Sequence, residues 1–284
     1  MSARASRRWR AALAGAALIV GVAAQAQTPT PTLGATESQA RAIIHARLVA
    51  SPYKMSERAR SGRIRYAIAF EPALSWPWPA TGEQRVQVRD LTDATALIDV
   101  CVDCGAEPAP DAAELQRYLA PNAWIDSDER SVHAFARQHA RGQGVERRMQ
   151  SLVKAVQQHM NGPIAYRDYL SASQALASRG GDCTEFALLL AALGRAQGIP
   201  TRIAYGIAYS SRFTGESHVF SPHVWTQAWN GQRWVSYDAG LGRFDSGHIA
   251  LRIGDGLPQD GAGVMSAIGR LKVIEATGVI DGAR

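Results

Sequence analysis

The sequence has few cysteines and, beyond its first 26 residues, no long apolar run. Three cysteines occur among 284 residues, and without a second cysteine pair or a histidine pair they do not supply the four ligands of a structural zinc site. No later segment reaches the roughly 20 apolar residues that span a bilayer. Calcium loops, nucleotide loops and other cofactor motifs are also absent. We therefore expect no cofactor, no bound metal and no stable membrane insertion of the processed chain.

The composition favours a compact protein without a nucleic-acid partner. Hydrophobic residues make up 46% of the chain and charged residues 20%, a balance that argues against disorder and fibres. Four arginines, at positions 4, 7, 8 and 10, account for most of the net charge of +6, and the other 27 basic residues nearly match the 25 acidic ones. Nucleic-acid binding is therefore not expected.

The N-terminus has the features of a cleavable secretory signal peptide. The arginines are followed by an apolar run over 11–24 and by Ala-Gln-Ala at 24–26, a small-residue cleavage pattern. We predict a signal peptide at 1–26 and a Thr/Pro-rich linker at 27–35. No cysteine follows the cleavage site, so a lipid-anchored form is not expected, and the predicted location is periplasmic or secreted.

Periodicity divides the remaining chain into a small β-rich domain over 36–110, a core over 111–275 and a tail over 276–284. Helices come first in the core and antiparallel strands follow, which indicates an α+β fold. Expected helices cover 37–60, which Pro52 breaks, then 112–119, 129–141, 145–160 and 183–197. Expected strands cover 64–70, 85–88, 96–100, 202–208, 223–229 and 233–238.

Cys183 is predicted to open a buried helix. Asp182 has the position of an N-cap and Glu185 that of its capping-box partner, and the nearly all-apolar run that follows indicates burial on all sides. Unpaired amides and the positive end of the helix dipole favour a thiolate, so we expect a lowered pKa for Cys183. Gly180 and Gly181 leave room for a substrate to approach.

His223 and Asp238 are predicted to meet across a β-hairpin. Asn230-Gly231 between two strand patterns indicates a two-residue turn, in which Trp229 pairs with Gln232. Counting back along both strands places His223 opposite Asp238, with Cβ atoms roughly 4.5–5.5 Å apart. The carboxylate would orient the imidazole while the other ring nitrogen takes the proton of Cys183.

Each of these residues alone is more often structural, because single buried cysteines and histidines commonly fill cores. Their coincidence favours a catalytic triad of Cys183, His223 and Asp238. His218 is the alternative base but lacks a predicted acid partner.

Other features remain open at this point. Cys101 and Cys104 are compatible with a disulfide, two free thiols or a zinc site. The sheet core is the expected place of five tryptophans, with the lining of a groove as the alternative: Trp76, Trp78, Trp225, Trp229 and Trp234. Ser211 to Ser217 is a candidate wall of the cleft.

Four stretches in order resemble the bacterial transglutaminase-like family. They are Gly-Asp-Cys-Thr-Glu-Phe-Ala at 181–187, Gly-Ile-Pro-Thr-Arg at 198–202, His-Val-Trp at 223–225 and Trp-Val-Ser-Tyr-Asp at 234–238. The resemblance covers about 119–253 and implies a papain-like α+β core. The β segment before it, with Trp-Pro-Ala-Thr-Gly-Glu-Gln at 78–84, looks like what bacterial members place there. Thr184 departs from the tryptophan that follows the nucleophile in eukaryotic cross-linking members.

We therefore expect an acyl-transfer enzyme that hydrolyses a peptide or protein amide through a thioester on Cys183. The departure at Thr184 and the water-rich exported location favour hydrolysis over protein cross-linking. Two alternatives stay open: a true transglutaminase, which transfers the acyl group to an amine, and a catalytically silent periplasmic binding module that keeps the fold.

Overall fold

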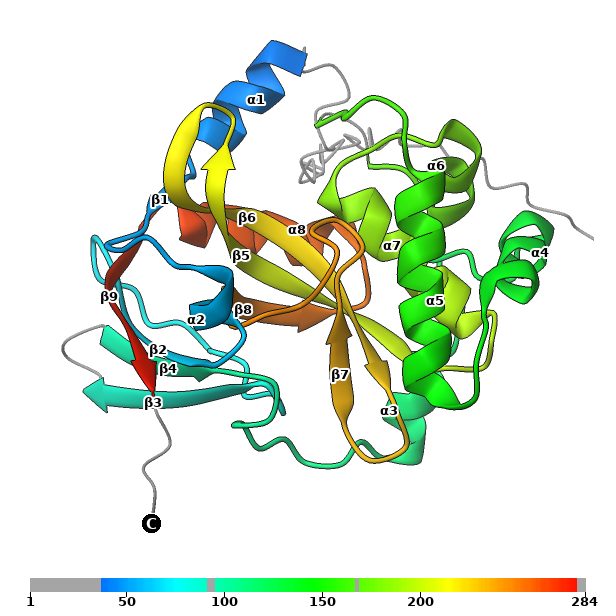
Figure 1. Ribbon diagram of the computed structural model, residues 1–284, viewed down its shortest axis with the longest axis horizontal. Helices are drawn as coiled ribbons and strands as arrows, with labels where there is room; N and C mark the ends of the chain where they lie inside the picture. The colour runs from blue at the N-terminus through cyan, green and yellow to red at the C-terminus, as the bar shows by residue number, and fades with distance from the viewer. Residues whose placement is uncertain (1–36, 91–94, 167–168, 280–284) are drawn as a thin grey trace, which may run out of the picture. The chain divides into compact units, whose positions relative to one another are not determined.

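Two antiparallel sheets organise the computed structural model, which describes residues 37–90, 95–166 and 169–279 (Figure 1). One sheet has the strand order β1-β6-β5-β8, with β7 also paired to β6; the other has the order β3-β4-β2-β9. The strands of the first sheet are β1 (Val49–Ala50), β5 (Thr201–Phe213), β6 (Glu216–Trp229), β7 (Trp234–Tyr237) and β8 (His248–Gly254). Those of the second are β2 (Arg63–Phe70), β3 (Gln84–Asp90), β4 (Thr95–Val100) and β9 (Leu271–Val279).

The helices centre on α7 (Cys183–Arg195), which packs against β5, β6 and the helices α4, α5 and α6. The others are α1 (Glu37–His45), α2 (Glu57–Arg60), α3 (Ala112–Arg117), α4 (Arg130–His139), α5 (Gly144–His159), α6 (Ala172–Ser178) and α8 (Pro258–Ile268). Every residue from Ala187 to Arg195 of α7 is buried. An all-apolar helix needs such cover on both sides, so the expected burial of this helix is confirmed.

The α+β class is confirmed, and the main element boundaries agree with the periodicity. The predicted helix over 37–60 is wrong for residues 46–56, between α1 and α2. There the chain turns to form β1, where Val49 pairs with Phe220 of β6, because strand pairing at a sheet edge overrides weak helical spacing. Helices α6 and α8 and strands β8 and β9 were not predicted.

Strand β9 joins the C-terminal part of the chain to the N-terminal sheet. It pairs with β2 from Phe70 opposite Leu271 to Arg63 opposite Val279, so a strand crosses the boundary expected between the core and the tail at residue 276. Across the stretches that the structure describes, none of the helices has the length and apolarity to cross a membrane. The predicted signal peptide and linker lie outside the described residues.

Candidate active site

Cys183 is the first residue of α7 and its thiol is free and half-buried. The Asp182 carboxylate accepts the amide of Thr184 at 2.8 Å, and the Glu185 carboxylate accepts the amide of Asp182 at 2.9 Å. Asp182 also takes the Glu185 amide, which completes the predicted capping box. This cap uses the amides of Thr184 and Glu185 and does not use the Cys183 amide, which belongs to the first turn, where amides have no carbonyl partner within the helix.

The expected lowering of the Cys183 pKa is wrong. Burial raises the pKa of this thiol well above its usual value, and the neighbouring carboxylate of Asp182 raises it further; the backbone amide of Val224 acts in the opposite direction. A helix terminus contributes only about 0.3–1 kcal/mol in favour of a thiolate, which is less than the cost of burying a charge. The sulfur therefore holds its proton at neutral pH and needs a base.

His223 and Asp238 form a buried pair beside Cys183. Nε2 of His223 donates to Oδ2 of Asp238 at 2.7 Å, and Oδ1 of Asp238 accepts the amides of Gly240 at 2.7 Å and Leu241 at 3.0 Å. Burial alone would raise the pKa of Asp238, but the charge and hydrogen bonds of His223 and a second histidine, His248, hold it well below its usual range. Asp238 is therefore a fixed, ionised carboxylate.

The contact between His223 and Asp238 was predicted from a register that the structure corrects. Trp229 pairs with Trp234 rather than Gln232, because Asn230 accepts the amides of Gln232 and Arg233 and lengthens the turn to four residues. A shift of two residues keeps every side chain on the same face of the sheet. Asp238, just past the end of β7, therefore still reaches His223, although it is not directly opposite.

Gly240 lies where the three side chains meet. A methyl group added to its α-carbon would lie 3.3 Å from Oδ1 of Asp238, 3.5 Å from Cε1 of His223 and 3.8 Å from Cβ of Cys183. The thiol and the imidazole therefore flank the same glycine, and the structure brings all three predicted site residues together.

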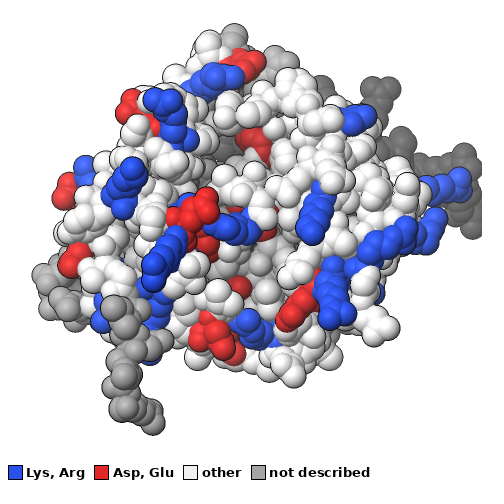
Figure 2. Space-filling model, viewed as in Figure 1, with Lys and Arg blue, Asp and Glu red and all other residues white. Residues whose placement is uncertain are grey.

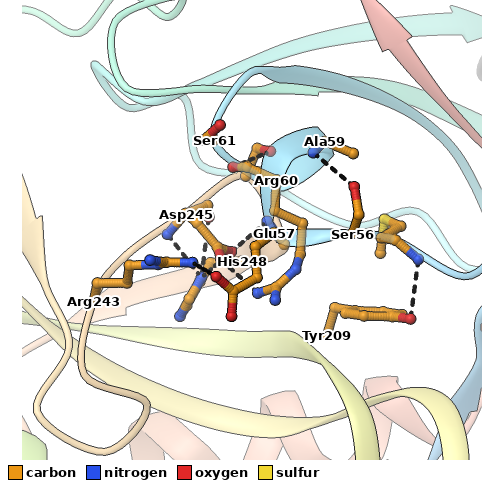
Figure 3. Close-up of polar contacts among 12 residues, drawn as sticks. Ser56, Glu57, Ala59, Arg60, Ser61, Tyr209, Arg243, Asp245 and His248 are labelled. Atoms are coloured by element: carbon orange, nitrogen blue, oxygen red, sulfur yellow. Dashed lines mark hydrogen bonds and ion pairs between the residues drawn. The ribbon is translucent and has the colours of Figure 1, made fainter.

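Sequence reasoning missed His248, the first residue of β8. Its Nε2 donates to the same Oδ2 of Asp238 at 3.0 Å, and its ring is 2% exposed. On the other side, Nδ1 lies 3.0 Å from the carbonyl oxygen of Asp245, as Figure 3 shows for the His248 and Asp245 side. The sequence did contain a signal for the strand that carries His248: the pattern His-Ile-Ala-Leu at 248–251 is typical of a buried strand.

His223, Asp238 and His248 also form the one group among the described residues whose ligand atoms could hold a metal ion, since these atoms lie within 4.8 Å of one another. Both imidazoles, however, direct an N–H at the carboxylate. A metal ligand needs a free lone pair at the same nitrogen, so the hydrogen bonds and a metal ion exclude each other here.

The remaining candidates have structural partners. Nδ1 of His218 lies 2.9 Å from the hydroxyl of Tyr209, so this ring nitrogen is paired with a hydroxyl group rather than with a carboxylate. Cys101 and Cys104 form a disulfide with α-carbons 5.6 Å apart, the first of the three states left open. Trp225 and Trp234 are buried in the core, as expected.

Acidic and basic side chains share the face of the molecule seen in Figure 2. Ion pairs include Arg117 with Asp255 and Arg243 with Glu57. The absence of a nucleic-acid partner stays a prediction, and so does the role of Ser211 to Ser217 as a wall of the cleft.

Residues 133–239, which include all three site residues, match the family model described as the transglutaminase-like superfamily. No curated protein matches the chain. Among solved structures, the chain is similar to a candidate cysteine protease from Cytophaga hutchinsonii, with 15% identity over 77% of this chain and 86% of that one and a TM-score of 0.46.

Two further structures show a weaker likeness. The periplasmic domain of TgpA from Pseudomonas aeruginosa is 20% identical over 65% of this chain and 74% of that one, with a TM-score of 0.44. Red sea bream transglutaminase is 11% identical over 64% of this chain and 47% of that one, with a TM-score of 0.34. These values are too low to carry an activity or a substrate to this chain.

Proposed function

Since residues 133–239 match the family model of the transglutaminase-like superfamily, we propose that the chain is an exported cysteine enzyme that hydrolyses peptide or protein amide bonds. Cys183 is the nucleophile, His223 the general base and acid, and Asp238 the group that orients His223. The observation that carries the proposal is the buried hydrogen bond of 2.7 Å between His223 and Asp238 next to the first residue of α7.

The proposed reaction begins with proton transfer from the Cys183 thiol to His223. Nε2 of His223 is held by Asp238, so Nδ1 is the nitrogen that takes the proton. The sulfur attacks the amide carbon, and the carbonyl electron pair moves to the oxygen, which the Cys183 amide stabilises. Collapse of this intermediate breaks the C–N bond, and His223 returns the proton to the leaving amine.

The second half of the reaction resolves the thioester. His223 removes a proton from water, the hydroxide attacks the carbonyl carbon, and the Cys183 thiolate leaves with the proton that His223 returns. Hydrolysis is proposed rather than amine transfer because Thr184 replaces the tryptophan of eukaryotic cross-linking relatives, and because the arginine-rich N-terminus predicts export into a water-rich compartment.

The experiment incubates the purified protein with an unfolded protein substrate and measures new amino termini, released ammonia and incorporation of a labelled primary amine. New amino termini or ammonia without amine incorporation support hydrolysis, and amine incorporation supports a transglutaminase instead. Cys183→Ala and His223→Ala are expected to abolish the product, whereas His133→Gln, on the half-buried face of α4, is expected to leave it unchanged.

Alkylation of Cys183 by iodoacetamide at neutral pH, mapped by mass spectrometry, tests the nucleophile without a substrate. Because the thiol has a raised pKa, we expect labelling in the wild type to depend on His223 and to slow about tenfold or more in His223→Ala. Equal labelling in both proteins, with no product from any substrate, would leave a binding module as the function.

A further inference from the structure

The carboxylate of Asp238 is shared between two histidines. Oδ2 accepts Nε2 of His223 at 2.7 Å and Nε2 of His248 at 3.0 Å. Oδ1 accepts the amides of Gly240 and Leu241. Four donors thus occupy the roughly four lone-pair sites of a carboxylate, so the group cannot rotate without losing a buried hydrogen bond. The catalytic steps of the proposed function use one of these donors, His223, and give no role to His248.

His248 is itself anchored on the side away from Asp238. Its Nδ1 faces Asp245, at 3.0 Å from the carbonyl oxygen, 3.3 Å from the amide nitrogen and 3.4 Å from Oδ1. The Asp245 carboxylate accepts the Gly247 amide at 2.9 Å and pairs with Arg60 of α2. Figure 3 shows Arg60 reaching from α2 towards Asp245, with His248 on the other side of this aspartate. A continuous polar chain therefore runs from α2 through Asp245 and His248 to Asp238.

The backbone reinforces this chain. The carbonyl oxygen of Arg60 accepts both the amide of Ser246, at 2.9 Å, and its hydroxyl, at 2.8 Å. Tyr66 of β2 donates to the carbonyl oxygen of Ser246 at 2.7 Å. The segment before β8 is thus held by α2 and β2, which fixes where His248 enters the site.

Several charged and titratable groups surround His248. Asp238 and Asp245 contact its two nitrogens, and the centroid of the His223 ring is 5.6 Å from its own. Arg60 reaches it through Asp245. Tyr66 donates to Ser246 close by, and the pair of Arg243 with Glu57 lies further out, on the exposed surface. The rings of Trp225 and Phe244 complete the enclosure.

The charge state of His248 follows from this balance. Burial lowers the pKa of His248, but the hydrogen bonds and charges of Asp238 and Asp245 outweigh it and raise the pKa to about 9. Both ring nitrogens then carry protons at neutral pH, with Asp238 as the acceptor for Nε2 and the carbonyl oxygen of Asp245 as the nearest acceptor for Nδ1. In this state Nδ1 does not accept the Asp245 amide, which lies 3.3 Å away.

We propose that His248 is a positioning residue of the triad, a buried cation that holds Oδ2 of Asp238 in the plane of His223 and offsets part of its charge. This inference rests on the proposed function of the Cys183 site. Without His248 the carboxylate would keep three of its four hydrogen bonds and would lose the one that holds Oδ2 from the side of β8. Without the positive charge, Asp238 would hold the proton on His223 more strongly, and less of the neutral imidazole would be present to act as a base.

The test compares His248→Gln, His248→Leu and the control His133→Gln. The glutamine side chain keeps an N–H near the position of Nε2 but carries no charge, whereas the leucine side chain lacks both. In His248→Gln we expect the pH limb of kcat/KM that reports His223 to move up by about one unit while kcat at its optimum stays within about threefold of the wild type. In His248→Leu we expect kcat to fall about tenfold to a hundredfold with KM little changed.

A readout that needs no turnover separates this inference from the proposed function. The NMR titration of the Hε1 proton of His223 is expected to have its midpoint about one pH unit higher in His248→Gln than in the wild type, with His133→Gln unchanged. If the wild-type protein hydrolyses nothing but this shift appears, the proposed function fails and the positioning role stands. An unchanged His223 titration in a folded His248→Gln protein, or equal loss of kcat in both His248 variants without any pH shift, overturns the inference.

Discussion

At the scale of single residues, the site is organised around one carboxylate rather than around the thiol. Cys183 has a raised pKa and depends on His223, and His223 depends on Asp238, which is the residue with four hydrogen bonds. The ionisation of Asp238 therefore controls the tautomer and orientation of the base. Residues on β6, β7 and β8 contribute to a single polar centre at this point.

Asp238→Asn is expected to lower kcat by about two to four orders of magnitude. An amide has one oxygen and one NH2 group, so it cannot accept from the two histidines at one position and from the amides of Gly240 and Leu241 at the other. Either the imidazoles or the backbone amides would face an N–H donor, and the site must rearrange. Steady-state kinetics at the pH optimum measures this loss. The control is Asp103→Asn, because the Asp103 side chain is 82% exposed. An Asp238→Asn protein that retains a tenth of the activity would remove Asp238 from the triad.

Gly240→Ala tests the space between the thiol and the imidazole. The new methyl group would lie at contact distance from Cys183 and His223 and would occupy the approach to the sulfur. We expect kcat/KM to fall about tenfold to a hundredfold with Tm changed by no more than a few degrees. Gly263→Ala in α8, whose added Cβ would have no neighbour within 4 Å, is the matched control. If Gly240→Ala keeps full activity, the prediction is wrong, and the substrate must reach the sulfur of Cys183 from a direction that the new methyl group does not block.

The site residues that were predicted from the sequence depend on local patterns, whereas the one that was missed depends on a contact between distant parts of the chain. Cys183 lies in a local motif of caps and glycines, and His223 and Asp238 are linked by one short turn. His248 depends on β8, which pairs with β5, a strand 40 or more positions earlier in the chain. Local patterns carry no information about such a pairing, and this is why the fourth member of the polar centre was absent from the prediction.

At the scale of elements, the N-terminal strands hold the strands that carry the site. The Glu83 carboxylate accepts the amide of Ser236 at 2.9 Å and also bonds the Ser236 hydroxyl. The next residue, Gln84, accepts the amide of Ala250 at 2.8 Å and donates to its carbonyl oxygen at 2.9 Å. Ser236 lies two residues before Asp238, and Ala250 lies two residues after His248. Glu83 and Gln84 therefore hold both the segment that carries Asp238 and the strand that carries His248.

Glu83→Gln is expected to flatten the pH dependence of stability. Burial raises the pKa of Glu83 to about 7 against the hydrogen bonds of Ser236, whereas in the unfolded chain the carboxyl ionises near its ordinary value of 4.5. Between these pH values the folded protein binds a proton that the unfolded chain does not. Glu83 should therefore lower the wild-type free energy of unfolding by roughly 1 kcal/mol per pH unit from about pH 4.5 to pH 7, in addition to the contribution of other groups.

Urea unfolding at several pH values across this window measures the slope for the wild type and for Glu83→Gln. The glutamine side chain remains neutral in both the folded and the unfolded state, so the contribution of this position to the slope should vanish. Glu57→Gln, with a side chain that is 78% exposed, should keep the wild-type slope. If the wild type and Glu83→Gln show the same slope, Glu83 does not bind the extra proton.

The turn between β6 and β7 shows how an element can be predicted for a wrong reason. Asn230-Gly231 correctly indicated a hairpin, but the Asn230 side chain closes a four-residue turn. The contact of His223 with Asp238 survived because a shift of two residues preserves which face each side chain occupies. A shift of one residue would have placed Asp238 on the opposite face.

At the scale of the whole molecule, the described residues belong to one compact unit, in which β2 from the N-terminal part of the chain and the C-terminal strand β9 share a sheet. Strand β2 lies between β4 and β9, and its buried side chains include Tyr66 and Ile68. The α+β class, the core helices and the two hairpin-forming strands of the site were predictable because their patterns are long and periodic. The return of β9 to β2 was not, since about 200 residues separate the paired strands and nothing local links them.

This topology predicts that a fragment of residues 36–110 does not fold cooperatively by itself. Without β9, strand β2 becomes an edge with unpaired backbone groups, and Glu83 and Gln84 lose their partners Ser236 and Ala250. We expect the fragment to lack a sigmoidal urea transition by far-ultraviolet circular dichroism, in contrast to the full chain. A matched fragment with residues 271–279 joined through a flexible linker should gain strand signal because it restores the fourth strand. A cooperative transition in the unextended fragment would establish 36–110 as the independent β domain expected from the sequence, and β9 would then be an addition to a sheet that is already stable.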